Sequence, residues 1–458
     1  MPNRFSMLLG LVFTIPAFIS PQAIAQYSFD EEPIRYNRTT ATDRVARLAA
    51  KMDSGEIKLE ANDQGDYIAA VLKELEIPTS SQALVFSKTS LQVHRISPET
   101  PRAIYFNDDV YVGWVQDGYM IEFAAMDDSL GGVFYSMRLD GRSPRLSRDR
   151  GGCIACHASQ RTARVPGFFI RSVYPRLDGR TRETGTVTDH RSPLESRWGG
   201  WYVTGTHGDL RHIGNAFADD PEDSERIDRE SGANLTSLSD RVDMHPYLTP
   251  HSDIVALMVM EHQMQTQNYI TLANYEARKA LASDQQAKLG DDKQAKRGDD
   301  KQAKRGDDKQ AKRGDDKQAK RGDDQAIPSL SKASEERIAV AGEKLVEYLL
   351  FCEEPTLPSP VEGTSAFTEE FASRGPVDSK GRGLRQFDLQ SRLFRYPCSY
   401  LIYSSSFNAL PKPMATYVRD RVLSVLRGED KSDRFSHLSV EDRSTILGIL
   451  TETKPDWF

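Results

Sequence analysis

The sequence predicts an α+β fold, in which an antiparallel β meander is combined with helices and with a mainly helical carboxyl-terminal region. Short aromatic and β-branched runs separated by turn residues predict the meander, and apolar residues at helical spacing predict the helices. A polar octapeptide that recurs five times interrupts the helical part. Hydrophobic residues make up 38% and charged residues 28% of the 458 residues, which excludes a collagen-like, coiled-coil or fully disordered chain.

The charge of the chain restricts its function. Lysine and arginine number 60 against 67 aspartates and glutamates, so the formal net charge at pH 7 is −7. Because phosphate contacts require a basic excess, nucleic acid is not an expected partner. The 4 cysteines are too few for a disulfide-dense scaffold, so their positions matter more than their number.

Residues 1–25 have the pattern of a signal peptide. Arg4 precedes an apolar stretch from Phe5 to Ile19, and Ala23-Ile24-Ala25 provides the small residues that signal peptidase requires. The stretch is shorter than the roughly 20 residues of a membrane-spanning helix. We therefore expect cleavage after Ala25 and a periplasmic or secreted mature protein without a membrane span, rather than an uncleaved anchor.

Residues 26–150 are expected to begin with two amphipathic helices, at 41–52 and 65–75. Five strand-like runs follow, and Asn107-Asp108 and Gly131-Gly132 are among the turn signals between them. The expected strands are Ala83 to Ser87, Ala103 to Phe106, Val110 to Val115, Tyr119 to Ala125 and Val133 to Leu139. This order predicts the antiparallel meander.

Residues 151–283 are expected to hold two more strand-like pieces and one long helix. The pieces are Phe168 to Tyr174 and Trp201 to Thr204. The helix is expected to run from Asp253 to about Ala282, with Ser252 as its cap. Its first turns are apolar on more than one face, which predicts a central, buried helix.

Residues 284–328 contain the octapeptide, from Gln286 to Gln325. Its copies have almost no large apolar residues, so they cannot bury enough surface to offset the entropy of ordering, and we expect a flexible linker. A docking tether is the functional alternative. Residues 329–458 are expected to be mainly helical. The predicted elements there are helices at Ser334 to Phe351, Met414 to Leu426 and Val440 to Glu452, a strand-like Ser399 to Tyr403, and an arginine-rich stretch from Leu384 to Arg395.

The motif Cys153-Ile154-Ala155-Cys156-His157 has the CxxCH spacing of c-type haem attachment. In such sites the two thiols add to the vinyl groups of haem, and the adjacent imidazole is the proximal ligand of the iron. Export supports this interpretation, since a covalent bond retains haem outside the cytoplasm. The sequence therefore predicts one covalent haem c, bound by Cys153 and Cys156, with His157 as the proximal ligand.

Two other interpretations of the motif are weaker. A zinc site would need a second pair of ligands at close spacing, but Cys352 and Cys398 stand apart. A thioredoxin-like CxxC would need a buried helix after it, whereas Pro166-Gly167 ends any helix early. Cys352 and Cys398 are instead candidates for a structural disulfide in an oxidising compartment.

The region around the motif is rich in arginine. Between Arg138 and Arg180 there are ten arginines, no lysine and three aspartates. Guanidinium groups pair with carboxylates in a bidentate manner, and haem carries two propionates. We expect one or two of these arginines to bind the propionates, and the others to form a basic rim for an acidic redox partner. The candidates for the propionates are Arg148, Arg150, Arg161, Arg164 and Arg171.

The second axial ligand separates an electron carrier from a haem enzyme, because only an iron with an open position binds peroxide or another small ligand. His262 and His207 are the candidate distal ligands, and His212 and Met414 are further candidates. Each of these residues also has an ordinary structural explanation, as a hydrogen-bonded core histidine, a turn residue or a packing methionine.

At CxxCH the chain resembles the c-type cytochromes. Four segments look like those of a group of exported monohaem proteins of uncharacterised function, and they are Cys153 to Gly167, Arg197 to Gly205, Glu261 to Gln263 and Arg395 to Tyr403. The resemblance implies haem c and electron transfer, with Cys153, Cys156 and His157 as attachment and proximal residues. Strand-like sequence on both sides of the motif departs from small all-helical cytochromes c.

We therefore expect a periplasmic monohaem c-type electron-transfer protein with a redox partner protein. A haem enzyme with an open distal site, such as a peroxidase or a small-molecule oxidoreductase, is the alternative. A haem sensor or assembly module is a third candidate.

Overall fold

The computed structural model describes residues 29–62, 66–88, 90–139, 144–181, 185–218, 227–303 and 330–458, with the side chains of all of these except 291–303. The predicted signal peptide, residues 1–25, and residues 304–328 of the predicted linker lie outside the described residues.

Strands and helices both occur along this part of the chain, which confirms the predicted α+β class. The strands are β1 Ala83–Val85, β2 Arg102–Phe106, β3 Val110–Trp114, β4 Met120–Asp127, β5 Gly131–Arg138, β6 Arg145–Arg148, β7 Ile170–Ser172 and β8 Thr186–Thr188. The α-helices are α1 Arg44–Asp53, α2 Ile68–Glu74, α3 Ile154–His157, α4 Ile254–Ala303, α5 Lys332–Leu349, α6 Phe367–Ala372, α7 Ser405–Asn408, α8 Lys412–Leu426 and α9 Val440–Thr453.

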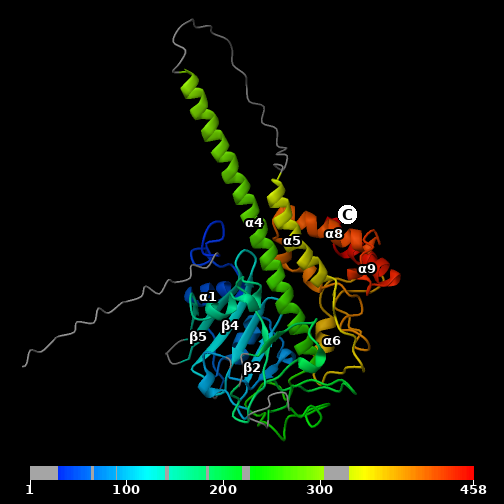
Figure 1. Ribbon diagram of the computed structural model, residues 1–458. Helices are drawn as coiled ribbons and strands as arrows, with labels where there is room; N and C mark the ends of the chain where they lie inside the picture. The colour runs from blue at the N-terminus through cyan, green and yellow to red at the C-terminus, as the bar shows by residue number, and fades with distance from the viewer. Residues whose placement is uncertain are drawn as a thin grey trace, which may run out of the picture.

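Strands β1 to β6 form one antiparallel sheet in sequence order, which confirms the predicted meander (Figure 1). The longest pairing joins β4 and β5, from Met120 opposite Arg138 to Asp127 opposite Gly131. The sequence does not predict β6, because three of its four residues are polar and it lies at the edge of the sheet. β7 and β8 pair separately as a small two-stranded sheet.

One face of the large sheet is covered by the first two helices. Residues opposite one another on neighbouring strands share a face. One such row consists of Tyr105, Val112, Phe123 and Tyr135. The hydroxyl of Tyr135 donates to Asp43, which caps α1, and the indole Nε1 of Trp114 donates to Asp66 at 2.6 Å, just before α2.

The opposite face of the sheet turns toward helix α4. Two of its rows are Phe106, Tyr111, Ala124, Phe134 and Ile104, Gly113, Glu122, Ser136. The Tyr111 hydroxyl donates to Gln267 Oε1 of α4 at 2.7 Å, so the helix covers the end of this face where β3 begins. The residues of the second row line the cavity that is described below.

Helix α4 is the predicted central helix, and its first part is buried as expected. The carboxylate of Asp253 accepts a hydrogen bond from the Val255 amide at 2.8 Å, so Asp253 and not Ser252 caps the helix. The Ser252 hydroxyl instead donates to the Tyr202 carbonyl at 2.6 Å and accepts from the Leu84 amide at 2.9 Å. Ser252 therefore ties β1 to the chain around Tyr202.

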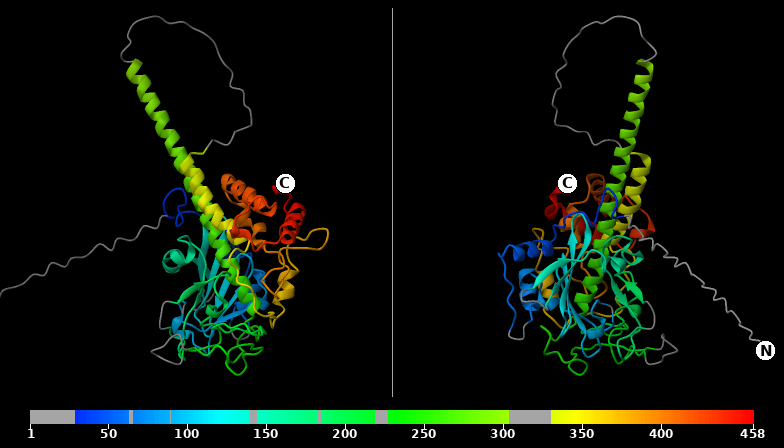
Figure 2. Two further views of the ribbon diagram at one scale, coloured as in Figure 1. Left: turned by 45° about the vertical axis from the view of Figure 1, so that its right-hand side comes forward. Right: turned by 90° about the vertical axis from the view of Figure 1, so that its left-hand side faces the viewer.

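Helix α4 continues beyond its predicted end. It extends to Ala303, so the prediction of a flexible linker is not confirmed for residues 284–303. The octapeptide is rich in Ala, Lys, Gln and Arg, which are good helix formers, and one Gly in eight residues costs only about 1 kcal/mol. The buried first part of α4 nucleates the helix, so each further turn only has to propagate it. The helix therefore continues outward from the body of the protein (Figure 2).

The carboxyl-terminal region packs on the other side of α4 from the sheet (Figure 1). Helix α5 lies along α4, and α8 packs on α5 and α9, so the three predicted helices of this region are confirmed. The predicted strand at Ser399 to Tyr403 is wrong, because Tyr400–Tyr403 forms a 3₁₀ turn in which the Leu401 amide donates to the Ser399 hydroxyl. Similarly, Trp201 to Thr204 makes only isolated bridges. Cys352 and Cys398 are buried free thiols.

Candidate functional site

The CxxCH motif lies directly after the edge strand of the sheet. Asp149 follows β6, and its amide donates to the Phe134 carbonyl of β5 at 2.8 Å. Its carboxylate in turn accepts from the Cys153 amide at 2.9 Å, so the motif is fixed to the sheet. Cys153 is half-buried at the start of α3, and Cys156 is exposed.

The imidazole of His157 is held by the loop that follows the motif. Its Nδ1 lies 2.9 Å from the Gly167 carbonyl oxygen, and the Gly167 amide donates to the His157 carbonyl at 2.8 Å. The rings of Phe134 and Phe169 have their centroids 4.7 Å from the imidazole. Burial lowers the pKa of His157 to about 4, so the ring is neutral at pH 7.

The protonation of His157 follows from this geometry. A carbonyl oxygen can only accept a hydrogen bond, so Nδ1 carries the proton and Nε2 carries a lone pair. Nε2 of His157 makes no hydrogen bond to the residues that the structure describes. The Nε2 atom therefore has an available electron pair, and the hydrogen bond from Nδ1 to the Gly167 carbonyl fixes the orientation of the ring.

Cys153, Cys156 and His157 line one cavity of about 330 Å³ on the α4-facing side of the sheet. This volume lies in the range of sites for small molecules and cofactors. Its walls combine aromatic and apolar side chains with few charged ones. The apolar and aromatic lining includes Val85, Ile104, Phe134, Phe168, Phe169, Trp201 and Met264.

A charged pair lies on the sheet side of the cavity. Arg102 Nη2 of β2 is 3.0 Å from Glu122 of β4, and both side chains are largely buried. The guanidinium passes over Gly113 of β3, where a β-carbon would lie only 2.1 Å from Arg102 Nη2. Glycine at 113 therefore leaves room for the guanidinium, which would have to shift to accommodate a β-carbon, and no feature of the sequence alone indicates this.

Two of the five candidate arginines reach the cavity. Arg161 and Arg171 line it, while Arg148 donates to the Tyr36 and Thr39 carbonyls and Arg150 to that of Asn37. Arg164 is exposed and does not line the cavity. Burial, and then the neighbouring charge of Arg161, lower the pKa of Arg171. Two adjacent guanidinium groups favour an anion at this end of the cavity.

Helix α4 contributes Met264 to the cavity. The sequence places Met264 only among the apolar residues of a buried helix, and no signal separates it from the other methionines there. Asn268, one turn later, accepts from the Phe168 amide at 2.9 Å and donates to the Phe168 carbonyl at 2.7 Å. The helix is thus fixed to the same loop that orients His157.

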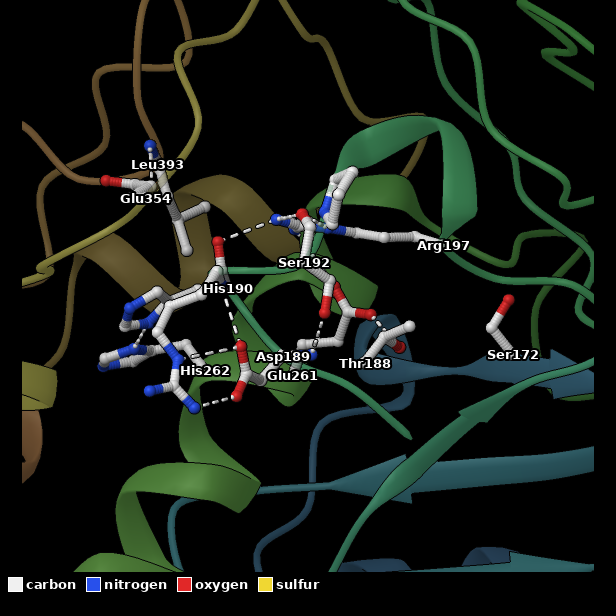
Figure 3. A network of polar contacts seen from close by, with 12 residues as sticks. Ser172, Thr188, Asp189, His190, Ser192, Arg197, Glu261, His262, Glu354 and Leu393 are labelled. Atoms are coloured by element: carbon white, nitrogen blue, oxygen red, sulfur yellow. Dashed lines mark hydrogen bonds and ion pairs between the residues drawn. The ribbon is translucent and has the colours of Figure 1, made fainter. Parts of the chain in front are cut away.

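The predicted distal ligands lie elsewhere. His262 Nδ1 is 2.8 Å from His190 Nδ1 (Figure 3), and its Nε2 is 2.8 Å from the Ser399 hydroxyl. His207 and His212 face each other with their Nε2 atoms 3.2 Å apart. Met414 is completely buried in α8. None of these four predicted residues lines the cavity that holds the CxxCH motif.

Figure 3 shows a second group of buried polar residues, which we call the His190–His262 network. Arg197 pairs with Glu261 at 3.2 Å, and Glu261 accepts from the Thr188 hydroxyl at 2.7 Å. Burial raises the pKa of Glu261 to about 7 and lowers the pKa of both histidines. The sequence gives no indication of His190, because only the folded chain brings it to α4.

Comparison with family models, curated proteins and solved structures found no match to this chain. Among the described residues there is no cluster of three or more His, Cys, Asp or Glu side chains suited to a metal ion. In the same part of the chain, no helix combines the length and apolar character needed to cross a membrane.

Proposed function

We propose that this cavity binds one haem c and that the protein is a periplasmic monohaem c-type electron-transfer protein. The observation that carries the proposal is the convergence of two thiols and one neutral imidazole with an available Nε2 on a single cavity. The CxxCH spacing requires these three groups for attachment and proximal ligation.

The residues of the cavity fit this group. The porphyrin supplies four nitrogen ligands to iron, so the protein needs no cluster of metal-binding side chains. A metal-binding histidine usually donates its other ring N–H to a carbonyl or carboxylate, as His157 does to Gly167. Phe134, Phe168 and Phe169 provide an apolar surface for a porphyrin, and Arg161 and Arg171 are suited to its propionates.

Each residue has a distinct role in this proposal. Cys153 and Cys156 hold the cofactor covalently, and His157 is the proximal ligand of the iron. Burial keeps the imidazole neutral, and the Gly167 carbonyl holds it in one orientation. The aromatic residues exclude water, which strengthens the influence of nearby charges on the iron. When bound, haem supplies a metal that accepts and releases one electron.

The position of the motif favours electron transfer. Cys156 is exposed, as are Gly151 and Gly152 just before the motif, so the attachment edge of the cavity reaches the molecular surface. Electron exchange falls steeply with distance, and an accessible edge allows a partner to approach. The Arg102–Glu122 pair favours the alternative of a haem enzyme, since paired charges beside an open iron assist proton transfer.

Attachment is tested by expressing the full chain in cells that mature c-type cytochromes and recording a pyridine haemochrome spectrum. We expect a c-type spectrum and one haem per chain. The double variant Cys153→Ser/Cys156→Ser should lose covalent haem, whereas Cys352→Ser/Cys398→Ser, with its two buried thiols changed, should retain it. A colourless wild-type protein would refute the proposal.

A further inference from the structure

We infer that Met264 of α4 is the distal axial ligand of the proposed haem. This inference rests on the proposed function and deepens it, because it assigns the sixth coordination position. Met264 is 8% exposed and lines the same cavity as His157. Its thioether is a soft donor that suits haem iron.

The cysteines, carboxylates and tyrosines that line the cavity are already engaged, and among them Asp149 accepts from the Cys153 amide. The two cysteines serve attachment, and Glu122 is paired with Arg102. The Tyr111 hydroxyl donates to Gln267 at 2.7 Å and accepts from Gln263 Nε2 at 2.9 Å. The Tyr135 hydroxyl points to the other side of the sheet, where it donates to Asp43.

Met264 belongs to a turn of α4 that is fixed on several sides. Glu261 is bonded to Arg197 and Thr188, and Gln263 Nε2 donates to the Asn107 carbonyl at 2.7 Å. Gln267 Nε2 donates to the Asp108 carbonyl at 2.8 Å. The methionine therefore projects from a rigid backbone, as a ligand with a defined position requires.

The same loop determines the positions of both proposed axial residues. Gly167 holds His157 through its carbonyl, and the next residue, Phe168, is bonded twice to Asn268. A β-carbon on Gly167 would lie 2.0 Å from Asn268 Oδ1, so only glycine permits this close approach. His157 and Met264 are consequently parts of one framework.

Axial ligation by Met264 has a functional consequence. A thioether in the sixth position closes the iron to small ligands and raises its reduction potential. It therefore favours the electron carrier over the haem enzyme.

The test is the response of the ferrous protein to carbon monoxide, recorded by visible spectroscopy. We expect no immediate change in the wild type and immediate binding in Met264→Ala and Met264→Leu. Leucine has nearly the volume of methionine, so Met264→Leu should still fold, and a change in its spectrum can be assigned to loss of the thioether. Met260→Leu, at a fully buried position of the same helix that does not line the cavity, should behave like the wild type.

Three results would overturn the assignment: immediate binding by the wild type, no binding by Met264→Leu, or equal binding by Met260→Leu. Met264→His should restore a closed iron and lower the reduction potential, since imidazole replaces thioether. The pyridine haemochrome of each sample separates the two proposals. Covalent haem with an unchanged Met264→Leu spectrum refutes the ligand alone, whereas absence of haem c in the wild type refutes the proposed function.

Discussion

The cavity at His157 and the His190–His262 network both contain neutral imidazoles among aromatic rings, and these are half-buried at His157 and buried at His190 and His262. At His157 one ring nitrogen donates to the Gly167 carbonyl, and the other has no hydrogen-bond partner among the described residues. At His262 both ring nitrogens have partners, His190 and Ser399. His190 also has a buried Nε2 without a hydrogen-bond partner, so what distinguishes His157 is an available ring nitrogen beside the two thiols of one cavity.

Helix α4 separates the two regions. His262 and Met264 are two residues apart, which corresponds to about 200° around an α-helix, so they point to nearly opposite sides. Met264 lines the cavity and His262 belongs to the His190–His262 network. A single helix can thus supply a ligand to one site and stabilise another.

The largest expected effect is a difference in haem content between a variant at His157 and a variant at His262. His157→Ala should lower the haem content of the purified protein at least about tenfold. Mutation of a residue that only hydrogen-bonds a metal ligand already costs about 10- to 100-fold in metal affinity, and loss of the ligand itself should cost no less. His262→Leu should leave the haem spectrum unchanged but reduce the free energy of unfolding by about 1–3 kcal/mol, because His190 and Ser399 lose their partner.

Pyridine haemochrome and urea unfolding measure the two effects. The comparison fails if a folded His262→Leu protein loses its haem spectrum, or if His157→Ala retains wild-type haem content.

The next expected effect concerns the pH dependence of the His190–His262 network. Burial raises the pKa of Glu261 to about 7 from an ordinary value near 4.5. Between these pH values the folded protein binds a proton at Glu261 that the unfolded chain has released, so the contribution of Glu261 to stability falls as the pH rises from about 4.5 to 7. The full loss is on the order of 3 kcal/mol. The histidines whose pKa is lowered by burial contribute a slope of the opposite sign, which both variants below retain.

The free energy of unfolding of Glu261→Gln should depend less on pH between pH 5 and pH 7 than that of the wild type. The variant should also be less stable overall, because Arg197 loses its counterion. The measurement is the free energy of unfolding in urea at several pH values. Glu195→Gln, at an exposed position, is the control and should keep the wild-type slope. Glu354, with a pKa raised by burial to about 7, leaves a residual slope in both variants. An unchanged slope in Glu261→Gln would contradict the expectation.

The cavity should be sensitive to a single methyl group at Gly113. Gly113→Ala places a β-carbon against the Arg102 guanidinium, whose flexible end must shift away from Glu122, so the free energy of unfolding should fall by about 1 kcal/mol, with a parallel decrease in haem content. Gly151→Ala, where a β-carbon meets nothing within 4 Å, should change stability by less than about 0.5 kcal/mol. Equal effects of the two substitutions would show that the Arg102–Glu122 pair does not depend on Gly113.

The smallest expected effect concerns the arginines of the cavity. Arg161→Gln and Arg171→Gln each remove a positive charge that favours the reduced iron, so the reduction potential should fall. We expect a fall of less than about 60 mV, the value that corresponds to a tenfold change in the equilibrium constant of a one-electron couple. Arg150→Gln, which lies outside the cavity, should change it less. Spectroelectrochemical titration measures these shifts, and a larger shift in Arg150→Gln would reverse the assignment of the arginines.

Much of the fold could be predicted, because local patterns control it. The period-two runs and turn residues predict β1 to β5 as a meander, and the apolar spacing predicts α8 and α9. The errors arise where distant contacts decide. Ser399 to Tyr403 has strand-like residues, but the Ser399 hydroxyl and the packing of α4 hold it as a 3₁₀ turn.

The sequence by itself determined the antiparallel meander, most of the helices and the CxxCH motif, because each depends on residues that are close in the chain. The available Nε2 of His157, the glycine beneath Arg102 and the placement of Met264 on the cavity rather than His262 were decided only by the tertiary structure. They depend on which side chains from distant segments occupy the remaining hydrogen-bonding and packing positions, and no local pattern records that.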